Sequence, residues 1–222
     1  MIALRRTGGM RMPQFREVLE VGDDGAFRMW RSVSMASALP SPIGRFAGQL
    51  PDGRRRELST AAGQAAGEGS RKWNARPDSP IDQVEVDGAT ATLGIHDPGD
   101  GGWGTLVGLL RPMLKELTES PIAAIALEID DGTRLVHKGT KALRLDFSNL
   151  TIRAFHWRGS GTEAQWTSVV KSADVVSVGP GWRLDLPFDH SFAIEEGDRV
   201  TVSVTFSVWD EERLVAVGLQ SP

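Results

Sequence analysis

The stretch Arg199-Val200-Thr201-Val202-Ser203-Val204-Thr205-Phe206-Ser207-Val208 is the clearest strand in the sequence. Apolar residues occupy every second position from Val200, and small polar residues lie between them. Side chains two positions apart on a strand point to the same face of a sheet, so the pattern predicts one buried face and one polar face. The stretch therefore indicates antiparallel β-structure in the C-terminal half of the chain.

The sequence around this strand has the same character from Ser120-Pro121 onwards. Short candidate strands are separated by turn residues at intervals of roughly ten residues, without a helical period. This spacing is typical of two packed antiparallel sheets. We predict an all-β sandwich over residues 120–222, with strands at 122–129, 134–137, 143–147, 151–157, 164–167, 175–178, 182–186, 199–209 and 214–219.

Two β-hairpins are predicted before this boundary. Residues 15–21 and 26–33 flank the turn sequence Gly22-Asp23-Asp24-Gly25, and residues 81–86 and 89–95 flank Asp87-Gly88. Both turns contain residues that tolerate positive φ, which two-residue and bulged hairpin turns require. A further short strand is expected at residues 43–50.

Two helices complete the predicted N-terminal module. One runs from a cap at Asp52 to about Glu68, and the other follows the apolar spacing from Trp103 to Leu117. Pro112 lies inside the second helix and predicts a kink or break near Arg111. We therefore expect an α+β module over residues 14–119, with antiparallel hairpins and two helices across one face.

Residues 1–13 precede the first of these patterns. They carry three arginines and lack the apolar run of about 7–15 residues that a signal peptide needs. We interpret this segment as a flexible leader.

The composition restricts the classes of partner and chemistry. The 222 residues have a net charge of −4 and no cysteine. No disulfide, thiolate metal site or cysteine nucleophile is possible, and a reducing, cytoplasmic location is expected. The acidic balance disfavours nucleic acid as a partner, and no run of ~20 apolar residues indicates a membrane span.

Catalytic and metal motifs are not evident in the sequence. The four histidines lack metal-site spacing, and Asp189-His190-Ser191 would point alternate side chains to opposite faces of an extended segment. The Gly-rich segment 98–102 is interpreted as a cap leading into the Trp103 helix, because it lacks the residues of a phosphate or calcium loop. We predict no catalytic residue, cofactor or metal, and keep as a minor alternative a metal-dependent hydrolase using His96, Asp97 and Asp100.

Two proline-containing loops are the candidate binding surface. Proline stiffens a loop and reduces the conformational entropy lost on docking, and tryptophan and arginine often dominate binding energy. The predicted partner-binding residues come from the segments 34–42 and 73–80, and they are Leu39, Pro40, Ser41, Pro42, Trp73, Arg76 and Asp78.

The first half also resembles the emfourin family. The resemblance is carried by Gly44-Arg45-Phe46-Ala47-Gly48, Arg76-Pro77-Asp78, the Val84-to-Gly88 strand and turn, Thr92, and Leu110-Arg111-Pro112-Met113-Leu114. It covers about residues 26–117. Emfourins inhibit thermolysin-like metallopeptidases, so the resemblance implies peptidase inhibition and a metallopeptidase as the partner.

The second half is similar to immunoglobulin-type sandwiches, which include intracellular inhibitors of subtilisin-type proteinases. Gly179-Pro180-Gly181-Trp182 and Glu196-Gly197-Asp198, each ahead of a predicted strand, carry this likeness. We therefore expect a non-enzymatic protein-binding protein, with peptidase inhibition as its particular activity. The alternative is a scaffolding subunit that self-assembles through exposed sheet edges.

Overall fold

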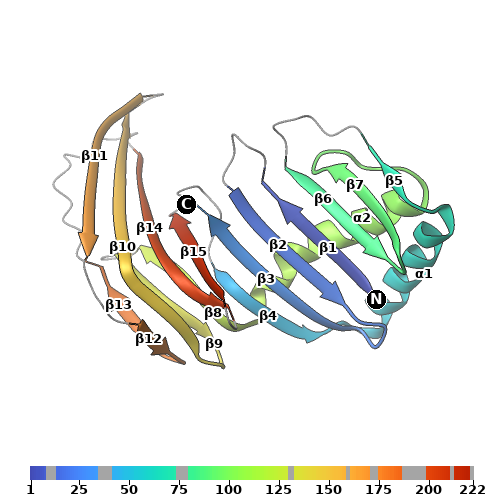
Figure 1. Ribbon diagram of the computed structural model, residues 1–222, viewed down its shortest axis with the longest axis horizontal. Helices are drawn as coiled ribbons and strands as arrows, with labels where there is room; N and C mark the ends of the chain where they lie inside the picture. Colours follow the sequence, from blue (N-terminus) through green and yellow to red (C-terminus); the bar gives the residue numbers. More distant parts are fainter. Residues whose placement is uncertain are drawn as a thin grey trace. The chain divides into compact units, whose positions relative to one another are not determined.

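The computed structural model describes residues 1–8, 14–34, 42–73, 80–129, 133–158, 161–170, 175–186, 199–210 and 213–220 (Figure 1). The chain divides into two compact units, Met1–Arg31 with Gly44–Ile122 (unit 1) and Ser32–Ile43 with Ala123–Pro222 (unit 2). The second unit thus includes a segment from the N-terminal half, which a single division at residue 120 does not anticipate.

Unit 1 contains an α+β arrangement, as the sequence predicts. Its strands form the order β4-β3-β2-β1-β6-β7-β5. The pairs β3–β4, β1–β2, β1–β6 and β6–β7 are antiparallel, and β5–β7 is parallel. The strands are β1 (Ile2–Thr7), β2 (Gln14–Val21), β3 (Ala26–Ser34), β4 (Ile43–Gln49), β5 (Arg71–Lys72), β6 (Ile81–Val86) and β7 (Ala89–Gly94).

The prediction of a flexible leader is wrong for residues 2–7. These residues form β1, which pairs with β2 on one side and β6 on the other. Ile2 and Leu4 are buried, with exposed fractions of 8% and 1%. The strand was missed because Arg6 follows them in the same alternating phase, where an apolar residue is the usual signal of a buried strand.

Both predicted hairpins of unit 1 are present. The Gly22 amide donates to the Ala26 carbonyl at 2.8 Å, and Gly25 has a φ of 84°. Asp87 and Gly88 have φ values of 48° and 85°, as a type I′ turn requires. Turn chemistry therefore fixed the positions of these two connections.

Two helices lie on one face of this sheet, α1 (Asp52–Glu68) and α2 (Gly101–Glu116), and the short 3₁₀ helix η1 (Leu117–Glu119) follows α2 (Figure 1). The helix spacing predicted from Trp103 is confirmed, because its apolar positions are buried. The buried residues of the two helices are Leu58, Ala61, Ala62 and Ala65 of α1 and Trp103, Leu106, Val107, Leu110, Met113 and Leu114 of α2.

Two details of the predicted helices are wrong. Asp52 is not the cap: Pro51 holds that position, and the Asp52 carboxylate pairs with Arg55 at 3.2 Å in the first turn. Pro112 does not break α2, which continues to Glu116. Pro112 and Gly108 are both exposed, so the Gly108 carbonyl that loses its helical donor faces water.

The two helices approach closely at Gly102. A Cβ atom added at Gly102 would lie 2.6 Å from the Ala65 nitrogen and 2.7 Å from the Gln64 carbonyl carbon. These are backbone atoms of α1, which cannot move aside as a flexible side chain could. The absence of a side chain at Gly102 is therefore a condition of the α1–α2 contact.

Unit 2 consists of strands alone in its described part. Strand β9 (Thr133–Gly139) pairs with β8 (Pro121–Ile129) and β13 (Arg183–Asp185). A second sheet has the order β11-β10-β14-β15, with β12 also on β10. These strands are β10 (Leu143–Arg158), β11 (Gly161–Val170), β12 (Val175–Val178), β14 (Arg199–Asp210) and β15 (Arg213–Gln220).

The alternation predicted for β14 is confirmed where its side chains are described, since Val202, Val204 and Phe206 are buried. Two predicted strands, 143–147 and 151–157, are instead the single strand β10, whose register on β14 shifts between Asp146 and Thr151. The Phe147 ring lies between these positions and contacts the Trp182 and Phe206 rings, at centroid distances of 6.1 and 5.8 Å. The immunoglobulin-like arrangement of the strands stays a prediction.

We predict that Gly102→Ala destabilises unit 1 by about 1–3 kcal/mol, because the new methyl group would overlap the α1 backbone. Gly108→Ala in the same helix is the matched control, since no atom lies within 4 Å of its added Cβ. That control should raise stability by about 0.5–1 kcal/mol through backbone entropy. Urea unfolding followed by circular dichroism measures both, and equal effects of the two substitutions would contradict the packing argument.

Candidate partner-binding surface

Most of the predicted binding residues cannot be placed. Leu39, Pro40, Ser41, Arg76 and Asp78 lie outside the described residues. Pro42 is half-buried and directly precedes β4, in the segment assigned to unit 2. Trp73 belongs to unit 1, so the described residues show no site that combines the two.

Trp73 continues the edge of the unit 1 sheet beyond β5. Its amide donates to the Thr92 carbonyl of β7 at 2.9 Å, and its side chain is half-buried. Ser70, just before β5, accepts the Thr90 amide through its hydroxyl at 3.0 Å. The backbone at Trp73 is therefore fixed by β7, whatever its side chain contacts.

The strand registers place the starts of several connections at one end of the unit 1 sheet. Thr7 pairs with Arg16 of β2 and with Ile81 of β6, and Ile81 pairs with Gly94 of β7. Arg31 of β3 pairs with Gly44 of β4. We call this the loop end, because the connections β1–β2, β3–β4, β5–β6 and β7–α2 all adjoin it.

A row of charged side chains crosses the helix-covered face next to the loop end. It consists of Arg31, Glu17, Arg6 and Asp82 on β3, β2, β1 and β6, together with Arg111 of α2, and we call it the charge row. Arg6 Nε and Nη2 donate to the two Asp82 carboxylate oxygens at 2.7 and 3.0 Å. Arg111 Nε donates to Asp82 Oδ2 at 2.9 Å. Asp82 has an exposed fraction of 0%, so both ion pairs are largely removed from water.

Arg111 also ties α2 to the chain that precedes it. Its two terminal nitrogens donate to the Asp97 carbonyl at 2.6 Å and the Gly94 carbonyl at 2.8 Å. One guanidinium thus joins a helix, the end of β7 and the carboxylate of β6. Arginine suits this role because its donors have a fixed planar geometry and it stays charged when buried.

In the part of the charge row formed by Arg31 and Glu17, attraction between the charges does not fully offset the cost of burying them. Arg31 Nε lies 3.0 Å from Glu17 Oε1, without the angle of a hydrogen bond, and Arg6 Nη1 lies 3.5 Å from Glu17 Oε2. Burial raises the pKa of Glu17 despite the nearby Arg31 and Arg6. Burial also lowers the pKa of Arg31 more than Glu17 raises it. Both shifts reflect desolvation, which for a buried ion pair can outweigh the attraction between its members.

In the part of the charge row formed by Arg6 and Asp82, attraction outweighs the cost of burial. Burial lowers the pKa of Arg6, but the hydrogen bonds and charges of Asp82 and Glu17 outweigh it, and the pKa is raised. The charged form of Arg6 is therefore favoured in the folded chain. Asp82 is the anion on which the stability of the row depends.

Sequence reasoning did not identify the charge row, although one signal was available. Arg6, Glu17, Arg31 and Asp82 each stand in the alternating phase of the buried residues on their strands. Two acids and two bases in buried phases of four strands are compatible with a core only if they pair. The strand order that brings them together was not deducible from the pattern of any one strand.

The Gly-rich segment leads into α2, but its N-cap residue Asp100 makes no side-chain cap hydrogen bond, and a residue of α1 takes that place. Glu68 Oε1 accepts the Gly102 amide at 2.6 Å, and Trp103 Nε1 donates to the Gly69 carbonyl at 3.0 Å. Asp100 pairs with Arg71 at 2.8 Å. A carboxylate of the protein itself thus accepts from the Gly102 amide at the start of α2, the position where a phosphate group would otherwise bind.

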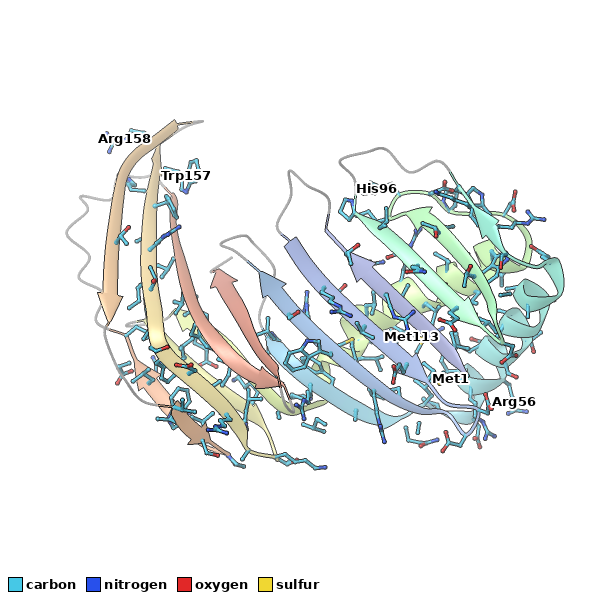
Figure 2. The ribbon with its side chains drawn as sticks, viewed as in Figure 1. Met1, Arg56, His96, Met113, Trp157 and Arg158 are labelled. Atoms are coloured by element: carbon cyan, nitrogen blue, oxygen red, sulfur yellow. The ribbon has the colours of Figure 1, made fainter. Side chains whose placement is uncertain are left out.

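The two acids of the minor hydrolase alternative bond to other groups of unit 1. Asp97 Oδ1 accepts the Gly99 amide at 2.9 Å, Asp100 pairs with Arg71, and His96 is exposed (Figure 2). Within the described residues, no group of three or more histidines and acids could hold a metal ion.

The opposite face of the unit 1 sheet carries a different set of residues. We call it the open face, because α1 and α2 both lie on the other side. Its residues on β1 to β4 and β6 include Arg5, Arg16, Val18, Glu20, Arg28, Trp30, Arg45 and Glu85. Trp30 pairs with Arg45 across β3 and β4, and the Arg45 guanidinium lies 5.8 Å from the centre of the Trp30 ring. A half-buried tryptophan among arginines is the composition expected of a binding surface.

Comparison with known proteins gives no relative: no family model matches, and neither the curated proteins nor the solved structures contain a significant match. No helix among the described residues is long and apolar enough to span a membrane.

We predict that Asp82→Asn destabilises unit 1 by about 3–5 kcal/mol, because it leaves two largely buried guanidinium groups without their anion. Glu85→Gln is the matched control on the same strand. The Glu85–Arg5 pair, at 3.2 Å, has both side chains about two-fifths exposed, so its loss should cost ~1 kcal/mol or less. Urea unfolding at neutral pH measures the free energy of unfolding of both variants. Similar losses of stability in the two would contradict the role assigned to Asp82.

Proposed function

We propose that this chain is a non-enzymatic, cytoplasmic protein that binds another protein through the loop end of unit 1. The observation that carries the proposal is the register of the sheet. It brings the described strand ends that flank the two predicted binding segments, Arg31 of β3, Gly44 of β4 and Ile81 of β6, to the same end of the sheet.

The charge row supports this proposal by its position. It lies next to the loop end and joins four strands to α2 by ion pairs. Because these ion pairs hold the strand ends, the connections leave the sheet from positions with little conformational freedom. Loops on a rigid scaffold lose less entropy on docking and often carry binding function.

Peptidase inhibition is the particular activity proposed, with a thermolysin-like metallopeptidase as the partner. Its support is the resemblance of residues 26–117 to the emfourin family, together with prolines in both loops. Proline limits the conformations of a loop before it docks, and a peptidase inhibitor needs a loop that resists rearrangement in the active site.

Trp73→Ala should weaken the inhibition of a thermolysin-type peptidase by about tenfold or more, because buried aromatic anchors commonly contribute over 1.4 kcal/mol each. The backbone hydrogen bond from the Trp73 amide to the Thr92 carbonyl remains when the side chain is shortened, so the melting temperature should change little. The measurement is peptide hydrolysis against inhibitor concentration.

Arg56→Ala is the control for this experiment, since Arg56 is exposed on α1, on the helix side of unit 1 (Figure 2). It should inhibit as the unaltered chain does. Absence of inhibition by the unaltered chain, together with capture of no other protein from a lysate of the source organism, would contradict the proposal.

A scaffolding subunit is the second candidate, favoured by the edges of the five-stranded sheet of unit 2. β11 and β15 lie at its two ends, and no described strand pairs with their outer sides. β15 has no charged residue after Arg213, in the sequence Leu214-Val215-Ala216-Val217-Gly218-Leu219-Gln220. Long uncharged edge strands readily pair with another copy.

Light scattering distinguishes the two candidates. A scaffold should have a mass above that of the 24.1 kDa chain. Ala216→Lys should then return it to the monomer, because Ala216 pairs with Ser207 on the polar face of β14 and a lysine there blocks edge pairing. A monomeric unaltered chain at all concentrations would exclude self-assembly through this edge.

A further inference from the structure

The open face of unit 1 has a charge opposite to that of the whole chain. It carries four arginines, Arg5, Arg16, Arg28 and Arg45, one lysine, Lys72 of β5, and two glutamates, Glu20 and Glu85, which leaves a surplus of three positive charges. The chain as a whole has a net charge of −4. The acidic groups are therefore concentrated elsewhere, and a basic surface remains on this face.

Two of these arginines have no ion-pair partner in the described part of the chain. Arg5 pairs with Glu85, and Arg45 lies against Trp30. Arg16 and Arg28 are exposed, and neither forms an ion pair with any described residue. On α1, by contrast, Arg54 and Arg55 each pair with an acid three residues away. Arg54 and Arg55 are thus neutralised by neighbours on their own helix, whereas Arg16 and Arg28 have no such partner among the described residues.

The surface near these arginines is partly apolar. Val18 and Trp30 are both half-buried on the open face, on the same strands as Arg16 and Arg28. Arg16 and Val18 are two apart on β2, and Arg28 and Trp30 are two apart on β3, so each arginine shares a face with an apolar neighbour. A ligand could thus meet positive charge and an aromatic surface together.

We propose that the open face binds an acidic segment of a protein partner. Carboxylates of the segment pair with Arg16 and Arg28, and an apolar side chain between them packs on Trp30 and Val18. The inference rests on the proposed protein-binding function and adds the chemistry of the partner. Charge complementarity is its warrant, since opposite potentials steer association and suppress wrong partners.

A nucleic acid fits the same face less well. Glu20 and Glu85 lie among the arginines, and the acidic chain would repel a polyanion at long range. A short acidic peptide carries less charge and can avoid the glutamates.

The test is fluorescence anisotropy with a short labelled peptide of aspartate and glutamate around a central Phe-Leu pair. The full chain should bind it, and a matched peptide with asparagine and glutamine in place of the acids should bind much less. The double variant Arg16→Glu/Arg28→Glu should bind the acidic peptide about tenfold more weakly, since each reversal replaces attraction by repulsion at an exposed site. Trp30→Leu should weaken binding of this peptide but not of one without the Phe-Leu pair.

Arg56→Glu makes the same change on α1 and should leave affinity unchanged, which separates a site from general charge. Equal weakening by Arg56→Glu, or no binding by the unaltered chain, would overturn the inference. So would tighter binding of a single-stranded oligonucleotide that depends on Arg16 and Arg28. A natural partner that binds the double variant as tightly as the unaltered chain would leave the proposed function standing and contradict this inference alone.

Discussion

Asp82 holds a carboxylate without exposed surface between the guanidinium groups of Arg6 and Arg111. A buried charge is tolerated only when it is paired and hydrogen-bonded, so these three residues have to be placed together for unit 1 to fold. The pairing fixes β1 next to β6 and brings α2 onto the sheet. The apolar core formed by Leu4, Leu19 and Val84 ends at this row, and the connections of the loop end begin just beyond it.

The functional proposals depend on two properties that this arrangement gives to the sheet. The helices α1 and α2 cover one face, and they pack closely because Gly102 has no side chain. The other face keeps its polar and aromatic residues for solvent or for a partner. A binding protein needs such a division between a rigid, buried side and an accessible one, and the connections that leave the loop end are the second proposed contact region. The two proposed surfaces are therefore properties of the same sheet.

The sequence predicted those elements that depend on local chemistry. The hairpins were found because Gly22–Gly25 and Asp87-Gly88 specify turns, and α2 was found because its apolar residues follow the helical period. β1 was missed because Arg6 occupies a buried phase, which is explained only by Asp82, far away in the sequence. The predictions from Pro112 and Asp52 were wrong for a related reason. Pro112 is exposed and does not break α2, and Asp52 pairs with Arg55 instead of capping α1. The charge row could not be assembled without the strand order, and the open face could not be distinguished from the covered one.

Amide hydrogen exchange of the Asp82→Asn variant tests the central claim most directly. If the charge row holds the loop end, exchange should accelerate at the ends of β1, β6 and β7 that adjoin it and around Arg111 of α2. The turns at Gly22–Gly25 and Asp87-Gly88, at the other end of the sheet, should exchange as they do in the unaltered chain. Uniform acceleration across unit 1, or no change at the loop end, would contradict the account.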